Sequence, residues 1–241
     1  MKLNQVVLAL ILNGAALVTA SCGGGGGGDS TPAVAIPLGT SVIRAYQQGD
    51  TITGTMNLRD TASGNTATGT VTYLLGSIVQ NPFGVDCREY TISGTVTGPA
   101  GTVAISGKQL LYQDANNSLY DCGEFNDNLG IYIFLTDTAA TPKGLNLTLE
   151  SPVQLGNTTS GIAVYDDGTW EDCTNTVQSI ENVSVPLGFY ETYKMYETCS
   201  YSDGTTLVNT AWMVPSIYNI KESGTIDGVS VEFLVTSYSY K

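Results

Sequence analysis

Carboxylates are the most abundant reactive side chains in this sequence. The chain has 241 residues, with 22 Asp and Glu against nine Lys and Arg, and it has no histidine. Catalytic triads that use an imidazole base and metal sites with His ligands are therefore excluded. The net charge of −13 also excludes a nucleic-acid partner, because the phosphate backbone attracts basic surfaces.

Two groups of acidic residues could carry out acid–base chemistry or bind a cation. They are the group around Trp170 (Asp166, Asp167, Glu171, Asp172) and the group in segment 114–128 (Asp121, Glu124, Asp127). A glycosidase needs two carboxylates about 5 to 9.5 Å apart in a cleft, and this spacing demands no such pair. Calcium favours dense oxygen ligands, but Leu119 stands where an EF-hand loop needs glycine. We interpret both groups as solvated turn residues and expect no catalytic residue, no metal and no cofactor.

The N-terminal 21 residues are typical of a bacterial export signal. Lys2 precedes a mostly apolar stretch that ends in small residues. The unbroken apolar run from Val6 to Leu12 is far below the roughly 18 residues that a spanning helix needs. The sequence LVTASC at 17–22 resembles the lipobox of bacterial lipoproteins, in which the cysteine, here Cys22, is lipidated. Ordinary signal-peptidase cleavage before Ser21 is the alternative.

Residues 22–35 follow as a glycine-rich tether. Six consecutive glycines come directly after Cys22, and a dozen such residues span roughly 20 Å. The tether is useful if Cys22 is held at a membrane by acyl chains, since two or three chains hold stably. The resemblance to lipoproteins implies this lipid anchor, and Gly23 in place of Asp implies the outer membrane. The protein would face either the periplasm or the cell surface.

Residues 36–241 are predicted to form one antiparallel β domain. Apolar residues recur at every second position, for example in 51–58, 67–75 and 229–235, while Thr and Ser occupy the other face. Asp-Gly pairs at 167–168, 203–204 and 227–228 predict hairpin turns. The fold class is therefore all-β, a curved sheet of about ten or more strands arranged as a half-barrel, barrel or sandwich. Only Ile131 to Leu135 is apolar on both faces, which predicts a central strand covered on both sides.

A faint internal repeat divides this domain into 49–150 and 156–241. Segment 49–54 matches 156–161, and 79–84 matches 183–188 at nearly the same offset. Chance similarity in a Gly- and Thr-rich chain is the alternative.

Four cysteines remain after Cys22, and an even number in an exported chain predicts two disulfides. A zinc site of four thiolates is disfavoured because no C-x2-C spacing occurs. The repeat places one pair in each half. We therefore prefer Cys87 with Cys122 and Cys173 with Cys199, with the two other connectivities left open.

The C-terminal half resembles bacterial envelope lipoproteins of unassigned function that are related in fold to the lipoprotein carriers LolA and LolB. The resemblance rests on 183–189 with 193–194, 212–215 with 217 and 220–221, and 234–238. Ser216 and Tyr218 depart from it, because the pattern has glycines there. The resemblance implies a half-barrel whose concave side holds a lipid or is plugged by its own chain, and it implies no catalytic residues.

The sequence thus favours a non-enzymatic lipoprotein, anchored in the outer membrane, that binds a lipid, a peptide or an envelope protein. One alternative is a surface adhesion or carbohydrate-binding module that uses exposed tyrosines such as Tyr190, Tyr196 and Tyr201, because aromatic rings stack on sugars. A glycosidase that uses the carboxylates is the other alternative.

Overall fold

Residues 34–127, 129–137 and 142–241 are described by the computed structural model, and nearly all of the regular structure among them is β-strand. Thirteen strands form one antiparallel sheet, which confirms the predicted fold class. A single 3-10 turn, Pro142–Gly144, accompanies them. The strands are β1 (Thr51–Asp60), β2 (Thr66–Gln80), β3 (Asp86–Gly98), β4 (Gly101–Gln113), β5 (Leu119–Asn126), β6 (Ile131–Phe134), β7 (Asn146–Leu149), β8 (Thr158–Val164), β9 (Trp170–Val185), β10 (Gly188–Tyr201), β11 (Thr206–Val214), β12 (Tyr218–Ile226) and β13 (Val229–Ser239).

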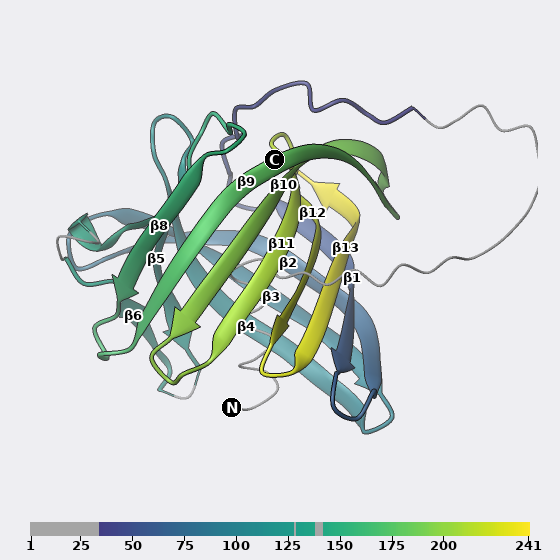
Figure 1. Ribbon diagram of the computed structural model, residues 1–241. Helices are drawn as coiled ribbons and strands as arrows, with labels where there is room; N and C mark the ends of the chain where they lie inside the picture. Colours follow the sequence, from purple (N-terminus) through teal and green to yellow (C-terminus); the bar gives the residue numbers. More distant parts are fainter. Residues whose placement is uncertain (1–33, 128, 138–141) are drawn as a thin grey trace, which may run out of the picture.

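The sheet consists of two meanders that meet in the middle. The strand order is β6-β5-β4-β3-β2-β1-β13-β12-β11-β10-β9-β8, and β7 pairs with β5 outside this path. Each half places its strands in the same order, as an internal repeat would. The halves join where β1 lies antiparallel to β13, with Thr51 facing Ser239. Figure 1 shows the sheet curling so that β2 to β4 pass behind β10 to β13.

The hairpins follow from local turn chemistry. The Asp-Gly pairs connect β8 to β9, β10 to β11 and β12 to β13, as predicted. At the last of these, Asp227 and Gly228 both have positive φ, 47° and 74°. This is the type I′ combination, whose twist matches that of the flanking strands. Short turns of this kind make each strand the neighbour of the next along the chain.

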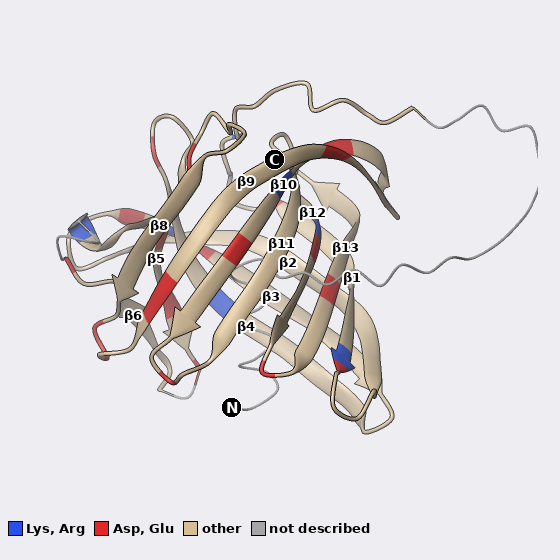
Figure 2. Ribbon diagram, in the orientation of Figure 1, with Lys and Arg blue, Asp and Glu red and all other residues tan. Residues whose placement is uncertain are grey.

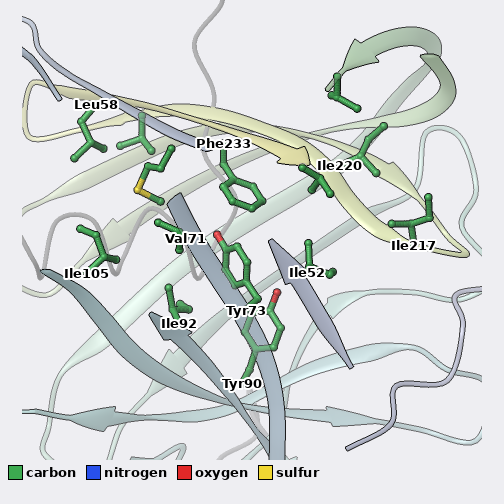
Figure 3. Close-up of a cluster of buried hydrophobic side chains, with 14 of the residues drawn as sticks. Ile52, Leu58, Val71, Tyr73, Tyr90, Ile92, Ile105, Ile217, Ile220 and Phe233 are labelled. Carbon is green, nitrogen blue, oxygen red and sulfur yellow. The ribbon is translucent and has the colours of Figure 1, made fainter. Parts of the chain in front are cut away.

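Large apolar side chains fill the space inside the curved sheet. Alternate residues of β1 to β3 and of β12 and β13 point inward, and they pack against one another across the two halves (Figure 3). Tyr73 of β2 stacks on Tyr90 of β3 and meets Phe233 of β13 edge-on, with ring centroids 5.3 and 5.0 Å apart. This part of the interior is therefore a packed core, and packed cores leave few voids larger than a water molecule.

The segment before β1 covers one end of the sheet. Ile43 is fully buried in a second apolar cluster, together with Leu149, Val153 and Met213. Asp50 fixes the end of this segment, because its carboxylate pairs with the guanidinium of Arg44 at 2.5 Å and accepts the backbone N–H of Lys241 at 3.0 Å. The residue directly before β1 therefore lies beside the C-terminal residue of the described chain.

The prediction of a doubly covered central strand at Ile131 to Leu135 is wrong. These residues form β6, an end strand of the sheet, and Ile131 is 54% exposed. Their apolar character has another cause. Tyr132 and Phe134 pack on the outer face against Cys87, Leu110 and Cys122, a third apolar cluster.

The two end strands approach each other without closing the ladder. Leu135, just after β6, forms an isolated antiparallel bridge with Tyr165, just after β8. Two backbone hydrogen bonds flank the bridge, from Thr136 N–H to Val164 O at 2.8 Å and from Asp166 N–H to Phe134 O at 2.9 Å. We call this approach the seam.

Candidate functional site

An open cleft lies at the end of the first half of the sheet. It has a volume of about 260 Å³. Its walls come from the ends of β2, β3 and β4, from the turn before β5 and from the segment before β1. The lining residues are Ala45, Tyr46, Leu75, Ile78, Asp86, Arg88, Tyr90, Leu111, Tyr112, Gln113, Asp114, Asn117 and Leu119. Both apolar and polar side chains line it, and ligand sites combine the two kinds.

The polar wall of the cleft is held in place by its own hydrogen bonds. Gln113 accepts the backbone N–H of Tyr46 at 2.9 Å and donates to the carbonyl of Arg44 at 2.9 Å. Asp114 accepts the N–H groups of Asn116 and Ser118 at 2.8 and 2.9 Å, which closes the turn. The cleft is therefore preformed, because the side chains that shape it are already anchored.

The size of the cleft limits what it can hold. Pockets for drug-sized ligands have volumes of about 300 to 1,000 Å³, so 260 Å³ accommodates one small apolar group with a polar neighbour. One apolar side chain or the end of one acyl chain fits the cleft.

A second polar region lies inside the sheet, near the seam. Four carboxyl side chains there are at least 94% buried: Asp121 of β5, Glu171 of β9, Glu197 of β10 and Glu222 of β12. Figure 2 shows acidic positions in the body of β9, β10 and β12 rather than only in the turns. The interpretation of Asp121 and Glu171 as solvated turn residues is therefore wrong. Both lie in strands, and each strand turns the side chain inward.

Amides and a phenol, rather than basic side chains, donate hydrogen bonds to three of these carboxyls. Asn209 donates to Glu197 Oε2 and Asn219 to Glu222 Oε1, both at 2.8 Å. Tyr165 donates to Asp121 Oδ2 at 3.2 Å across the seam. No ion pair in the described part of the chain involves Asp121, Glu197 or Glu222.

Burial controls the ionisation of this cluster. Burial raises the pKa of Asp121 to about 6, although the hydrogen bonds that the Asp121 carboxylate accepts act to lower it. Burial also raises the pKa of Glu222 to about 7. Burial also raises the pKa of the neighbouring Glu124 to about 7, and the negative charge of Asp121 adds to this. Burial first and then the charges of Glu171 and Glu222 hold the pKa of Glu197 well above its usual range. Part of the cluster therefore carries protons near neutral pH.

The predicted acidic groups are divided by the structure rather than assembled. Asp127, Asp166 and Asp167 are exposed outside the strands, as expected of turn residues, whereas Asp172 is exposed but belongs to β9. Residues 119–126 form β5, so the carboxylates of segment 114–128 do not gather in one loop. Glu171 is buried inside the sheet and Asp172 points outward, so they do not form a carboxylate pair in the open cleft.

The four cysteines form two separate bonds, with the connectivity that the repeat favours. Cys87 of β3 is joined to Cys122 of β5 on the outer face, and their Cα atoms are 6.4 Å apart. Cys173 and Cys199 face each other directly across β9 and β10, with Cα atoms 4.1 Å apart. Each bond therefore staples one half of the sheet, and neither crosses between the halves.

The tyrosines do not form an exposed patch. All 14 lie in the described part of the chain, and Tyr238 alone is exposed, at 42%. Tyr190 is buried, while Tyr196 and Tyr201 are half-buried. The flat aromatic surface that an adhesion or sugar-binding module would need is absent from these residues.

Cys22, the export signal at 1–21 and most of the tether at 22–35 lie outside the described residues. Within the described ranges, no helix has the length and apolar character needed to cross a membrane.

Comparisons with known proteins give three structural likenesses. No protein-family model matches the chain, and no curated protein matches it significantly. It is similar to a candidate exported protein with a YmcC-like fold from Bacteroides fragilis, with 12% identity, a TM-score of 0.38, and coverage of 82% of this chain and 99% of that one. It is also similar to a candidate lipoprotein from Parabacteroides distasonis, with 11% identity, a TM-score of 0.37, and coverage of 83% of this chain and 98% of that one. The third likeness is to a β-barrel-like protein from Brucella abortus that has a domain of unknown function. The identity is 10%, the TM-score is 0.42, and the match covers 82% of this chain and 99% of that one. TM-scores below 0.5 carry no inference about function.

Proposed function

We propose that this protein is a non-enzymatic envelope lipoprotein that binds, in the cleft beside Tyr46, a ligand with one small apolar group next to a polar one. The cleft carries the proposal: it is open, preformed and lined by both kinds of side chain. Apolar side chains of an envelope protein or peptide, or the end of a single acyl chain, have this chemistry.

Cys22 supplies the attachment to the membrane in this proposal. The sequence LVTASC at 17–22, followed by six glycines, supports acylation of Cys22 and a location at the outer membrane. Labelled palmitate should be incorporated into the wild-type protein and not into the Cys22→Ala variant. If the wild-type protein incorporates no palmitate, or if intact protein is found free in the medium, the lipid anchor is rejected. The proposal that the cleft binds a ligand does not depend on this result.

Filling the cleft tests the binding role. Ala45 is exposed on the cleft wall, so Ala45→Trp places a large ring in the space without burying a polar group. Ala104→Trp is the matched control, because Ala104 is exposed on β4 and does not line the cleft. The probes are laurate and a short amidated peptide with one phenylalanine, titrated by NMR against protein purified without detergent.

Shifts at cleft residues in the wild type and in Ala104→Trp, lost in Ala45→Trp, would support the proposal. Saturating millimolar probe without shifts at the cleft would overturn it, as would equal binding by both variants. If laurate alone shifts these residues, the ligand is an acyl chain, and if the peptide alone does, it is a protein segment.

A further inference from the structure

The C-terminal part of β9 forms an open sheet edge. β8 pairs with β9 only from Trp170 to Thr176, and the loop at Asn157 adds hydrogen bonds with Val177. From 178 to 185, β9 pairs with β10 alone among the described segments. Figure 1 shows this part of β9 running past β8 and arching over the rest of the sheet. We call residues 178–185 the β9 edge.

The hydrogen-bonding pattern between β9 and β10 determines where the unpaired backbone groups of the β9 edge point. On β10, Phe189 O accepts the N–H of Ile36, and the N–H of Glu191 donates to Ile36 O, both at 2.8 Å. Phe189 and Glu191 therefore point their backbone groups away from β9. In an antiparallel pair, residues directly opposite share this direction, so their partners Ser184 and Asn182 point outward from the β9 edge.

Ile180, opposite Tyr193, continues the same alternation. The β9 edge therefore presents three outward N–H and three outward C=O groups, two residues apart, which is the spacing that an added strand requires. Ile180 is 42% exposed, and the side chains of Asn182 and Ser184 are exposed beside it.

Two of the usual protections against strand addition are missing at this edge, while a β-bulge at Gln178 marks its start. It contains no lysine and no proline between 178 and 185, and its one charged residue, Glu181, is paired with Lys194 at 3.4 Å. The opposite edge of the same hairpin already accepts an extended segment, since Ile36 pairs with β10 there. The hairpin therefore has the shape of a strand acceptor on both sides.

We propose that the β9 edge binds an extended segment of a separate, basic polypeptide by strand addition. The charge decides between a partner and a second copy, because two copies would each bring a net charge of −13. This surface is separate from the cleft, so the two proposals can fail independently.

Amide hydrogen exchange followed by NMR tests the geometry and the binding together. In the protein alone, the N–H groups of Ile180, Asn182 and Ser184 should exchange fast, while those of Glu181 and Val183 are protected by β10. The probe is a short peptide that alternates threonine and valine and has lysine at both ends. Adding it should protect the three fast amides, and the same peptide with glutamate at its ends should bind at least about tenfold more weakly.

Two substitutions at Asn182 separate the contribution of its backbone N–H to binding from that of its side chain. Asn182→Pro removes one outward N–H and should weaken binding about tenfold or more, whereas Asn182→Ala keeps the N–H and should bind within about twofold of wild type. Ser184→Pro provides a second test near the tip if the first proline variant does not fold.

Three results would overturn the proposal. The first is fast exchange of the three amides at millimolar lysine peptide. The second is their protection in the protein alone at low concentration, which would mean that the chain covers its own edge. The third is protection that grows with protein concentration together with dimers in sedimentation, which would assign the edge to a second copy.

Discussion

Tyr165 donates a hydrogen bond to Asp121 Oδ2 at 3.2 Å, and this contact links the two ends of the sheet. Asp121 belongs to β5 near one end, and Tyr165 follows β8 at the other. The backbone bridge between Leu135 and Tyr165 lies beside it. A side-chain hydrogen bond therefore joins the two ends of the sheet where the backbone ladder stops.

Removing this phenol should loosen the seam. Tyr165→Phe leaves the buried carboxyl of Asp121 without one donor, and we expect the free energy of unfolding to fall by about 1 to 2 kcal/mol in urea titrations at pH 7. Tyr196→Phe is the matched control, because Tyr196 is half-buried and lies on the alternate face of β10 from Glu197. A loss in the control as large as that in Tyr165→Phe would contradict this assignment.

The buried carboxyls should make the protein more stable in mild acid than in mild base. Folding raises the pKa of Asp121 to about 6 and those of Glu124 and Glu222 to about 7. The folded state therefore binds more protons than the unfolded state between about pH 4 and pH 7, and stability falls as the pH rises through this window.

Glu222→Gln should flatten this dependence, since it removes a shift worth about 3 kcal/mol at roughly 1.4 kcal/mol per pKa unit. Urea midpoints at pH 5 and pH 8 measure the effect. A wild-type protein that is more stable at pH 8 than at pH 5 would contradict the expected sign.

The disulfide between Cys173 and Cys199 should contribute strongly to stability. Replacing both residues with serine should cost about 2 to 4 kcal/mol, because the unfolded chain is no longer constrained by the loop. Urea unfolding measures the loss, and a peptide map of the non-reduced wild type checks the connectivity. Fragments that join Cys87 to Cys173, or Cys122 to Cys199, would show that the pairing is wrong.

The carboxylate of Asp50 should hold the segment before β1 in place. Hydrogen bonds from Arg44, Gln47 N–H and Lys241 N–H outweigh the cost of burial and keep the pKa of Asp50 below its usual range. Asp50→Asn should lower the free energy of unfolding by about 2 kcal/mol and speed tryptic cleavage at Arg44. Asp172→Asn, at an exposed position on β9, should change neither quantity. Wild-type cleavage rates in Asp50→Asn would exclude this role for Asp50.

The strands and hairpins could be predicted because their signals are local. Alternation with period two and Asp-Gly pairs act within a few residues, so they remain readable without knowledge of the fold. The position of Ile131 to Leu135 could not be read in this way. Its apolar outer face reflects packing against Cys87 and Cys122, which are close only after the sheet has formed.

The burial of these carboxyls was not predicted, although the alternation of inward and outward side chains along a strand indicates it. Glu171 is two residues before Cys173, and Glu197 is two residues before Cys199, so each shares a face with a cysteine of the disulfide between β9 and β10. A disulfide on the inner face of the sheet therefore implies that both glutamates point inward. The cleft left no such pattern, because its walls come from five segments that only the tertiary fold brings together.

The pairing of β1 with β13 also determines when the molecule can finish folding. Thr51, in the first described strand, pairs with Ser239, in the last described strand. Contacts between residues so far apart in sequence slow folding, because most of the loop-closure entropy is lost before they form. Until β13 has been synthesised, β1 can pair with β2 alone, and the other flank of β1 has no partner strand.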